Sequence, residues 1–322
     1  MLNSLKYLFL VLLVGLGNCL IAQQLPIFTQ YSEYGGLINP SYIHFDNYHL
    51  DYDVSAGVSY RDQWSQIPDR PRTFIARYEK SNTKQSGANI NFGGYLMNDK
   101  IGAFSTTELR TRVAVFFRTK DVRKQRLGGF SLGLNVGISQ YTVDLRDLPS
   151  IDIDPLLFNG RSAVFTPDLG VGLSYINEFA NSDYLQIGLS VPQVFSLDPT
   201  FRNESQRFEI QKVPHFYVTG SYYKMLKDEK YLEFSTWIKH VDNIPLNVDA
   251  LVRYRFNKYL WLGAGANSAG IIHTEVGLLY TTESKEIFKL SYSFNPSFQT
   301  HTALLGNIHE LNITYLLKSR KR

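Results

Sequence analysis

The stretch Leu50–Trp64, LDYDVSAGVSYRDQW, alternates between apolar and polar residues over almost its whole length. One set comprises Tyr52, Val54, Ala56, Val58 and Tyr60, and the other comprises Asp51, Asp53, Ser55, Gly57, Ser59 and Arg61. A period of two places these sets on opposite faces of a β-strand. An apolar face that ends in tyrosines, opposite a face with carboxylates and an arginine, is typical of a wall between lipid and water.

The first 22 residues have the pattern of an export signal. Lys6 and the N-terminal amine precede the apolar run Tyr7–Gly17, which is too short to span a bilayer. Ala22 precedes the expected cleavage point, so we expect residues 1–22 to be a cleaved signal peptide; an uncleaved anchor is the alternative. The single cysteine, Cys19, lies inside this segment, so we expect no disulfide and no cysteine chemistry in the mature chain.

Composition narrows the class of protein further. The net charge of +4 is too small to indicate a nucleic-acid partner, and the chain contains 21 Tyr, 21 Phe and 3 Trp. After the signal, no apolar run approaches the roughly 18 residues that a spanning helix needs. An exported, aromatic-rich chain without spanning helices indicates the outer membrane of a Gram-negative cell, where only a closed barrel satisfies every backbone donor and acceptor.

Alternating segments recur along the whole chain at about the length of a tilted membrane strand, roughly 9–11 residues. They number fourteen: Leu50–Arg61, Thr73–Lys80, Ala88–Leu96, Ile101–Arg118, Leu127–Ile138, Asp168–Tyr175, Tyr184–Ser190, His215–Tyr223, Tyr231–Ile238, Leu246–Phe256, Leu260–Ala266, Thr274–Tyr280, Phe288–Asn295 and Glu310–Leu317. We therefore predict an all-β fold, a transmembrane antiparallel β-barrel of about 14 strands over residues 48–318. Residues 23–47 would be a periplasmic or luminal segment, and residues 319–322 a charged tail.

The connections between these segments sort by length. With both termini in the periplasm, the connections after even strands are all short and polar. The four longest connections all follow odd strands: Asp62–Arg72, Ser139–Pro167, Val191–Pro214 and Pro296–His309. Short periplasmic turns and long external loops are characteristic of outer-membrane barrels. A soluble β-sandwich or propeller is the alternative, but the many aromatic residues near strand ends favour the membrane barrel.

Charged residues of both signs have the inward parity on their strands. They are Asp51, Asp53, Arg77, Glu79, Glu108, Arg110, Arg112, Asp168, Glu233, Asp249, Arg253, Arg255 and Lys289. A wet, open pore could hold such charges singly. Because unpaired charges in a narrow, partly dry interior are costly, we expect ion pairs across the lumen, which the N-terminal segment would also help to fill.

Catalytic and cofactor motifs are missing from the sequence. The seven histidines are scattered without paired metal spacing, and the glycine-rich stretch Gly263–Gly270 precedes no helix that could bind phosphate. We therefore expect no enzyme, no cofactor and no metal site.

The loop and turn residues resemble one known family, the PorP/SprF proteins of the Bacteroidota type IX secretion system. The family's N-terminal motifs match Phe28-Thr29-Gln30-Tyr31 and Asn39-Pro40-Ser41-Tyr42, and its first external loop matches Tyr60, Arg61, Gln63, Trp64, Ile67, Pro71 and Thr73. Asp69-Arg70 departs from the small residues that are usual before this proline. Weaker matches continue to His309-Glu310, so the resemblance covers nearly the whole mature chain.

The resemblance implies an outer-membrane component of type IX secretion that helps to secrete large adhesins with a type B C-terminal domain, or holds them at the cell surface, in some cases for gliding. It also implies a link to the periplasmic PorK/PorN (GldK/GldN) ring. We expect the client at Asp62–Arg72 and the long loops, and the ring at Gln23–Asn47 and the even turns. The motif residues could equally be scaffold. Two alternatives remain at this point: a substrate-specific passive channel similar to fatty-acid porins, and a plain structural barrel.

Overall fold

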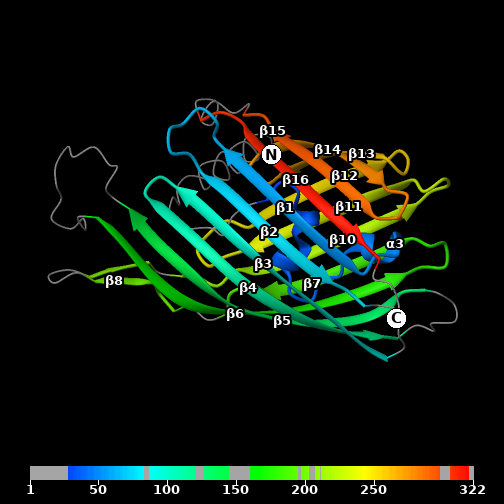
Figure 1. The fold of residues 1–322 in the computed structure, drawn as a ribbon, viewed down its shortest axis with the longest axis horizontal. Coiled ribbons are helices and arrows are strands. Elements are labelled where there is room, and N and C mark those ends of the chain that lie inside the picture. The colour runs from blue at the N-terminus through cyan, green and yellow to red at the C-terminus, as the bar shows by residue number, and fades with distance from the viewer. Residues whose placement is uncertain are drawn as a thin grey trace, which may run out of the picture.

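The computed structural model describes residues 28–82, 87–119, 126–144, 160–194, 197–202, 207–210, 212–297 and 305–318. Fourteen strands of this described part form one closed antiparallel barrel (Figure 1), which confirms the predicted fold. Strands adjacent in sequence are adjacent in the barrel, and β1 closes it by pairing with β16. The expected signal peptide and the tail at residues 319–322 lie outside the described residues.

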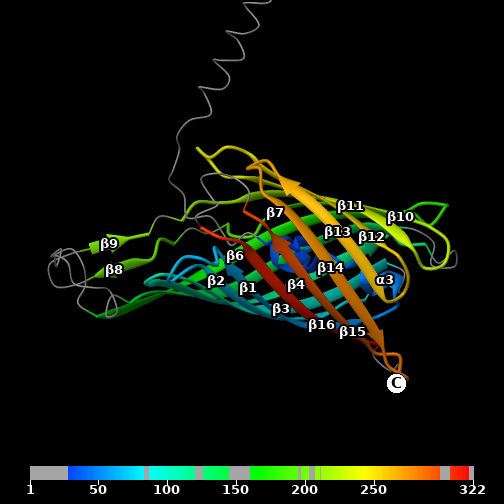
Figure 2. The same ribbon diagram turned by 90° about the horizontal axis from the view of Figure 1, so that it is seen from above.

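The barrel strands differ considerably in length. Their bounds are β1 Val54–Gln63, β2 Arg72–Lys80, β3 Gly87–Ile101, β4 Phe104–Arg118, β5 Gly128–Asp144, β6 Arg161–Glu178, β7 Tyr184–Val191, β10 Phe216–Met225, β11 Tyr231–His240, β12 Asn247–Arg255, β13 Leu260–Asn267, β14 Ile272–Thr281, β15 Ile287–Asn295 and β16 Ile308–Leu317. The remaining two strands, β8 (Thr200–Arg202) and β9 (Arg207–Glu209), form a separate hairpin in the β7–β10 connection. This hairpin lies at the opposite end of the barrel from α3 (Figures 1 and 2).

Alternation sets the two faces of the barrel wall. On β5, Phe130, Leu132, Leu134, Val136 and Ile138 are all exposed on the outer face, while Ser131, Asn135 and Ser139 between them are buried. The outer face is thus apolar and the inner face polar, the arrangement that a barrel in lipid requires. No helix in the described part of the chain is long and apolar enough to cross a membrane.

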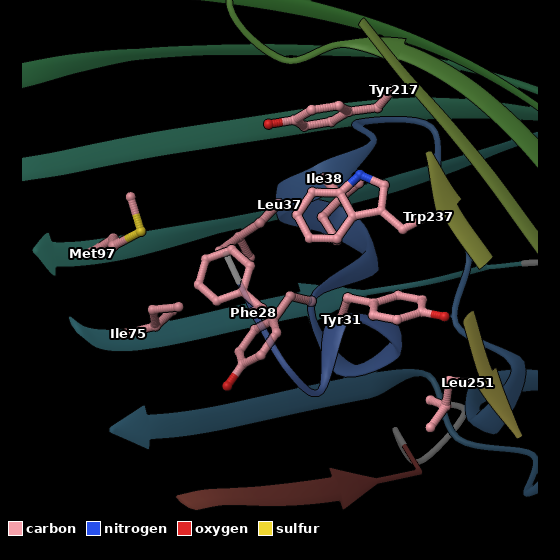
Figure 3. Packing of buried hydrophobic residues seen from close by; sticks show 10 residues of the cluster. Phe28, Tyr31, Leu37, Ile38, Ile75, Met97, Tyr217, Trp237 and Leu251 are labelled. Atoms are coloured by element: carbon pink, nitrogen blue, oxygen red, sulfur yellow. The ribbon is translucent and has the colours of Figure 1, made fainter. Parts of the chain in front are cut away.

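The N-terminal segment lies inside the barrel. It contains the short helices η1 (Tyr31–Tyr34), α2 (Gly35–Ile38) and α3 (Phe45–His49), which both ribbon views place within the ring of strands (Figures 1 and 2). Figure 3 shows the aromatic and aliphatic side chains of this segment packed against those of the wall, with Phe28, Tyr31 and Leu37 beside Trp237. We call residues 28–50 the plug.

Two sequence assignments at the start of β1 were wrong. Tyr52, expected on the lipid face, is buried in a cluster with Trp261, Leu279 and Leu316. Asp51 is exposed, has a left-handed φ of 58° and pairs with Lys318, so it does not face the lumen. The reason is that the strand begins only at Val54, after a turn that leads out of the plug, so the alternation does not extend back to Asp51.

Strands β5 and β6 extend further into one external connection than predicted. Both ends of the loop expected at Ser139–Pro167 are strand, because β5 and β6 stay paired as far as Asp144 and Arg161. Beyond the membrane-facing part, the inward side chain of Val143 packs against Phe201 and Ile210 of the β7–β10 connection. This small hydrophobic cluster packs against the ends of β5 and β6 that extend beyond the membrane-facing part.

Substitution of a lipid-facing residue tests the orientation of the wall. Leu134 lies at the centre of the apolar band of β5, whereas Thr142 has the same outward parity near the strand end. We expect Leu134→Arg to lower the free energy of unfolding by about 2–4 kcal/mol, and Thr142→Arg by only about 0–1 kcal/mol. Denaturant unfolding of both variants in lipid vesicles measures this. Equal costs at the two positions would contradict the placement of the band.

Candidate functional site

The first N-terminal motif binds the inner wall of the barrel. The backbone N–H groups of Thr29 and Gln30 donate to the carboxylate of Glu310 at 3.0 and 3.2 Å, and the Gln30 side chain donates to the Glu310 carbonyl at 3.2 Å. The Tyr31 hydroxyl donates to Ser235 at 3.3 Å. Phe28 is buried in the cluster of Figure 3. These motif residues therefore hold the plug and are not exposed to a partner.

The second motif binds the opposite wall. The Asn39 amide donates to Leu173 O and Ser174 Oγ on β6 at 3.4 and 3.3 Å. Arg112 of β4 donates to the carbonyls of Pro40 and Tyr42 at 2.9 and 3.0 Å.

Close approach between the plug and the wall depends on glycine. A Cβ on Gly172 would lie 2.0 Å from Asn39 Oδ1, and one on Gly133 would lie 2.2 Å from Ser41 N. Only residues without a side chain allow this contact.

A buried charge cluster joins the plug to β11, β12, β14 and β15. Lys289 Nζ lies 2.7 Å from Glu33 Oε1 and 2.8 Å from Asp46 Oδ2, so one wall cation binds two plug carboxylates. Arg253 bridges Glu33 at 3.4 Å, Glu233 at 3.1 Å and Glu275 at 2.8 Å. Because these side chains are at most 18% exposed, each charge depends on its partners.

The plug carboxylates stay ionised at neutral pH. Burial on its own would raise the pKa of Asp46, but the neighbouring Lys289 ammonium outweighs it and holds that pKa well below the usual range. The pKa of Glu33 is likewise lowered, because Lys289 and Arg253 together overcome the cost of burial. The pairs therefore persist over the whole physiological pH range.

Two further ion-pair groups lie on the β2–β6 side of the lumen. Arg112 lies 3.0 Å from Glu79, which also contacts His44 of the plug at 3.2 Å. In the second group, Arg110 bridges Glu108 and Asp168 at 2.9 and 3.0 Å, and Lys212 contacts Asp168 at 2.8 Å.

The remaining residues of the predicted luminal network have different partners. Asp249 pairs with Lys239. Arg255 instead donates to the carbonyls of Asn257 and Lys258 in its own turn, at 3.1 and 3.3 Å. Asp51 pairs with Lys318 at the periphery and does not face the lumen, and Asp53 precedes β1 in a bend.

Sequence reasoning missed the contribution of the plug to these pairs. Glu33, His44 and Asp46 all precede the first strand, where no alternation reports which way a side chain points. Glu275 and Glu310 were missed as well, although both have the inward parity of their strands and are buried. That parity was the signal that could have found them.

The residues that match the family's first external loop lie in three environments. Tyr60 is exposed on the outer face, whereas Arg61 is buried in the lumen, 4.0 Å from Glu310. Thr73 is also buried and donates to Asp99 at 2.6 Å. Arg61 therefore faces the lumen near the loop end of β1.

At the loop end, Gln63, Trp64 and Pro71 are half-buried. Gln63 N donates to Pro71 O at 3.0 Å, and Trp64 turns the chain out of β1 with a left-handed φ of 61°. The loop then binds the β15–β16 connection, because Ser65 N donates to Asn307 O at 3.1 Å and Gln66 N donates to Leu305 O at 3.2 Å. This rim loop, residues 64–71, is therefore held in place by backbone hydrogen bonds.

The comparison with protein families identifies the chain's relatives. The family described as "Type IX secretion system membrane protein PorP/SprF" matches residues 20–315. The chain belongs to this family. The resemblance drawn from the motifs is confirmed, and this PorP/SprF protein is an outer-membrane component of the type IX secretion system. Family and fold together indicate a protein of secretion or transport.

Solved structures show the same barrel fold. Similar barrels include the toluene transporter TodX of P. putida (TM-score 0.50, 10% identity, covering 89% of this chain and 94% of that one). A TodX deltaS2S3 mutant, a monoaromatic hydrocarbon channel, matches with TM-score 0.53 and 10% identity over 88% and 94% of the two chains. The toluene transporter TbuX of Ralstonia pickettii matches with TM-score 0.53 and 10% identity over 84% and 89%. No curated protein matches the chain in sequence. At such low identity the structural likeness concerns the fold alone.

Removing the shared cation tests how the plug is held. We expect Lys289→Met to destabilise the plug by about 3–5 kcal/mol, because Glu33 and Asp46 lose their common partner while buried. Limited proteolysis of the folded barrel should then cut within residues 28–50 much faster than in the wild type. The triple variant K289M/E33Q/D46N, which removes the charges together, should recover most of the protection. Wild-type protection in K289M alone would contradict this assignment.

Proposed function

We propose that this PorP/SprF protein holds secreted adhesins with a type B C-terminal domain at the cell surface, and that it contacts the periplasmic PorK/PorN (GldK/GldN)-type ring. The observation that carries the proposal is the filled lumen. The plug is bound to opposite walls by the Glu310, Asn39 and Lys289 contacts, which leaves the two ends of the barrel as the exposed surfaces for partners. Recognition at these ends, not passage through the lumen, is the role that such an interior favours.

The loop end has the features of a binding surface. The rim loop is fixed to the β15–β16 connection, and the β8–β9 hairpin is supported by Phe201 and Ile210 on the extended β5–β6 strands. Ordered loops on a rigid scaffold commonly carry function, and short hairpins can bind a partner by adding a strand. We assign the client to the rim loop and this hairpin.

The turn end is the side we assign to the ring. The segment Gln23–Asn47 was first expected to take part there, but its described part, residues 28–47, is mostly buried inside the barrel. The ring contact therefore falls to the short polar turns, such as Leu226–Lys230 and Thr282–Glu286, which the structure leaves exposed.

A passive channel for small apolar solutes is the second candidate. Its support is a small hollow, with a cavity volume of about 30 Å³, on the loop side of the plug, lined by Phe28, Met97, Tyr217 and Trp237 with Glu108 and Arg110 at its wall. An apolar hollow with few polar groups is typical of a small-molecule pocket. On the turn side, however, the plug and its ion pairs lie across the path to the periplasm.

Pull-down from native membranes separates the candidates. Wild-type protein should co-purify with an adhesin and with ring proteins; ring proteins alone would indicate a structural barrel, and neither partner would favour the channel. Replacing Ser65–Arg70 with a Gly/Ser linker should release the client into the medium and lower the surface-bound amount roughly tenfold or more, a loss of about 1.4 kcal/mol in binding. Ring capture should be unchanged.

Replacing Lys227–Glu229 at the turn end with the same linker is the matched control, and it should keep the client attached. Both variants should retain the migration of a folded barrel on unheated gels. A client that stays attached after the Ser65–Arg70 replacement would show that the rim loop is not its binding site.

A further inference from the structure

The lipid-facing wall carries a row of polar residues at the loop end of four neighbouring strands. Strand register places one residue of each strand side by side, from β16 through β1 and β2 to β3: His309, Asp62, Arg72 and Lys100. All four have the outward parity of the exposed apolar residues below them on the same strands. We call these residues the basic row.

Beneath this row the wall is apolar except for Asn98, which lies next to Phe74 on β3 and is half-buried. In the next row toward the membrane centre, Leu311, Tyr60 and Phe74 are paired side by side, and all three are more than 40% exposed. One row further, Ile313, Val58 and Leu96 continue the apolar surface. Acyl chains against this wall would bring a lipid headgroup to the level of the basic row.

The charge of the basic row is positive and only partly neutralised. Arg70 of the rim loop binds Asp62 with two hydrogen bonds, at 2.6 and 2.8 Å. Arg72 reaches Asp62 only at 3.7 Å, and its side chain is 48% exposed. Lys100 is exposed beside it. Even with Asp69 of the same loop counted, three cations face two carboxylates.

Arg72 and Lys100 form a pair of neighbouring basic residues that the other strands, in their described parts, do not repeat at the loop end of the outer face. On the remaining strands, the outward residues nearest the loop end in the described part of the chain are Ser105, Asp144, Arg161, Val191, Phe216, His240, Val248, Ala266, Ile272 and Phe294. Arg161 of β6 is the single Lys or Arg among them, and its register partner on β5 is the acidic Asp144. A basic side chain on the lipid face is tolerated only near the interface, where its cost falls to about 0–1 kcal/mol, and there it meets the lipid headgroups. The pair is therefore a local feature and not part of a general basic belt.

We propose that Arg72 and Lys100 bind the phosphate of a phosphorylated glycolipid in the outer leaflet of the outer membrane. The loop end faces that leaflet, whose glycolipids carry phosphate groups on an acylated sugar core. An arginine guanidinium binds phosphate through parallel hydrogen bonds, and a lysine ammonium adds a point charge. Tyr60 and Phe74 contact the acyl chains beneath. The site is independent of the secreted client.

Native mass spectrometry of the purified barrel in detergent tests this proposal. Diphosphorylated lipid A is titrated into wild type, and dephosphorylated lipid A into a parallel sample. The phosphorylated form should bind at least roughly tenfold more tightly, because each basic residue near an anionic lipid surface contributes on the order of 1 kcal/mol. Equal binding of the two lipids would overturn the proposal, and so would displacement of lipid A by low-millimolar inorganic phosphate, since the site would then bind free phosphate.

Matched variants locate the site. R72Q/K100Q should lose roughly tenfold or more of the affinity for diphosphorylated lipid A, while R72K/K100R, which keeps both charges, should retain most of it. The control K80Q/K224Q removes two exposed lysines at the opposite end of the wall and should bind as wild type does. Wild-type affinity in R72Q/K100Q, or an equal loss in the control, would refute the assignment.

Discussion

The pairing of two wall cations with the carboxylates of the plug is the interaction on which the rest of this structure depends. Glu33 and Asp46 are buried inside a barrel, and they remain charged there only because Lys289 lies within 2.8 Å of both and Arg253 approaches Glu33. Breaking a buried pair leaves an uncompensated charge, which is far more costly than losing an exposed one. The plug and the wall therefore stabilise each other.

As a consequence, the surface of this PorP/SprF protein, and not its lumen, is the part that a partner protein can reach. Polar contacts on opposite walls, through Glu310 on β16 and Ser174 on β6, hold the plug across the full width of the barrel. The likeness to hydrocarbon transporters is one of fold, and a shared barrel can serve different tasks. Here the ordered rim loop, the β8–β9 hairpin and the basic row all lie at the loop end.

The sequence predicted the barrel well because one rule, alternation, governs every strand. It assigned strand number, connectivity and the lipid face, and inward parity identified Arg110, Arg112 and Arg253 as buried side chains. Alternation says nothing where no strand exists, so the roles of Glu33 and Asp46 could not be predicted, and Tyr52 and Asp51 were misplaced. The parity of a residue predicts which face of the wall its side chain is on, but not which residue it binds. Arg253 and Arg255 are neighbours on one face, yet Arg253 binds three carboxylates and Arg255 binds the carbonyls of its own turn. Partners across a lumen depend on the closed three-dimensional structure.

Locking the plug to the wall tests the central claim most directly. Ser41 Oγ and Ser174 Oγ lie 2.7 Å apart, so Ser41→Cys and Ser174→Cys should form a disulfide between plug and wall. The measurement is the amount of surface-bound adhesin in oxidised and in reduced cells. If the plug stays in place during function, this amount should be the same in both. Loss of surface adhesin on oxidation, restored by reductant, would show that the plug must leave the lumen and would contradict this account.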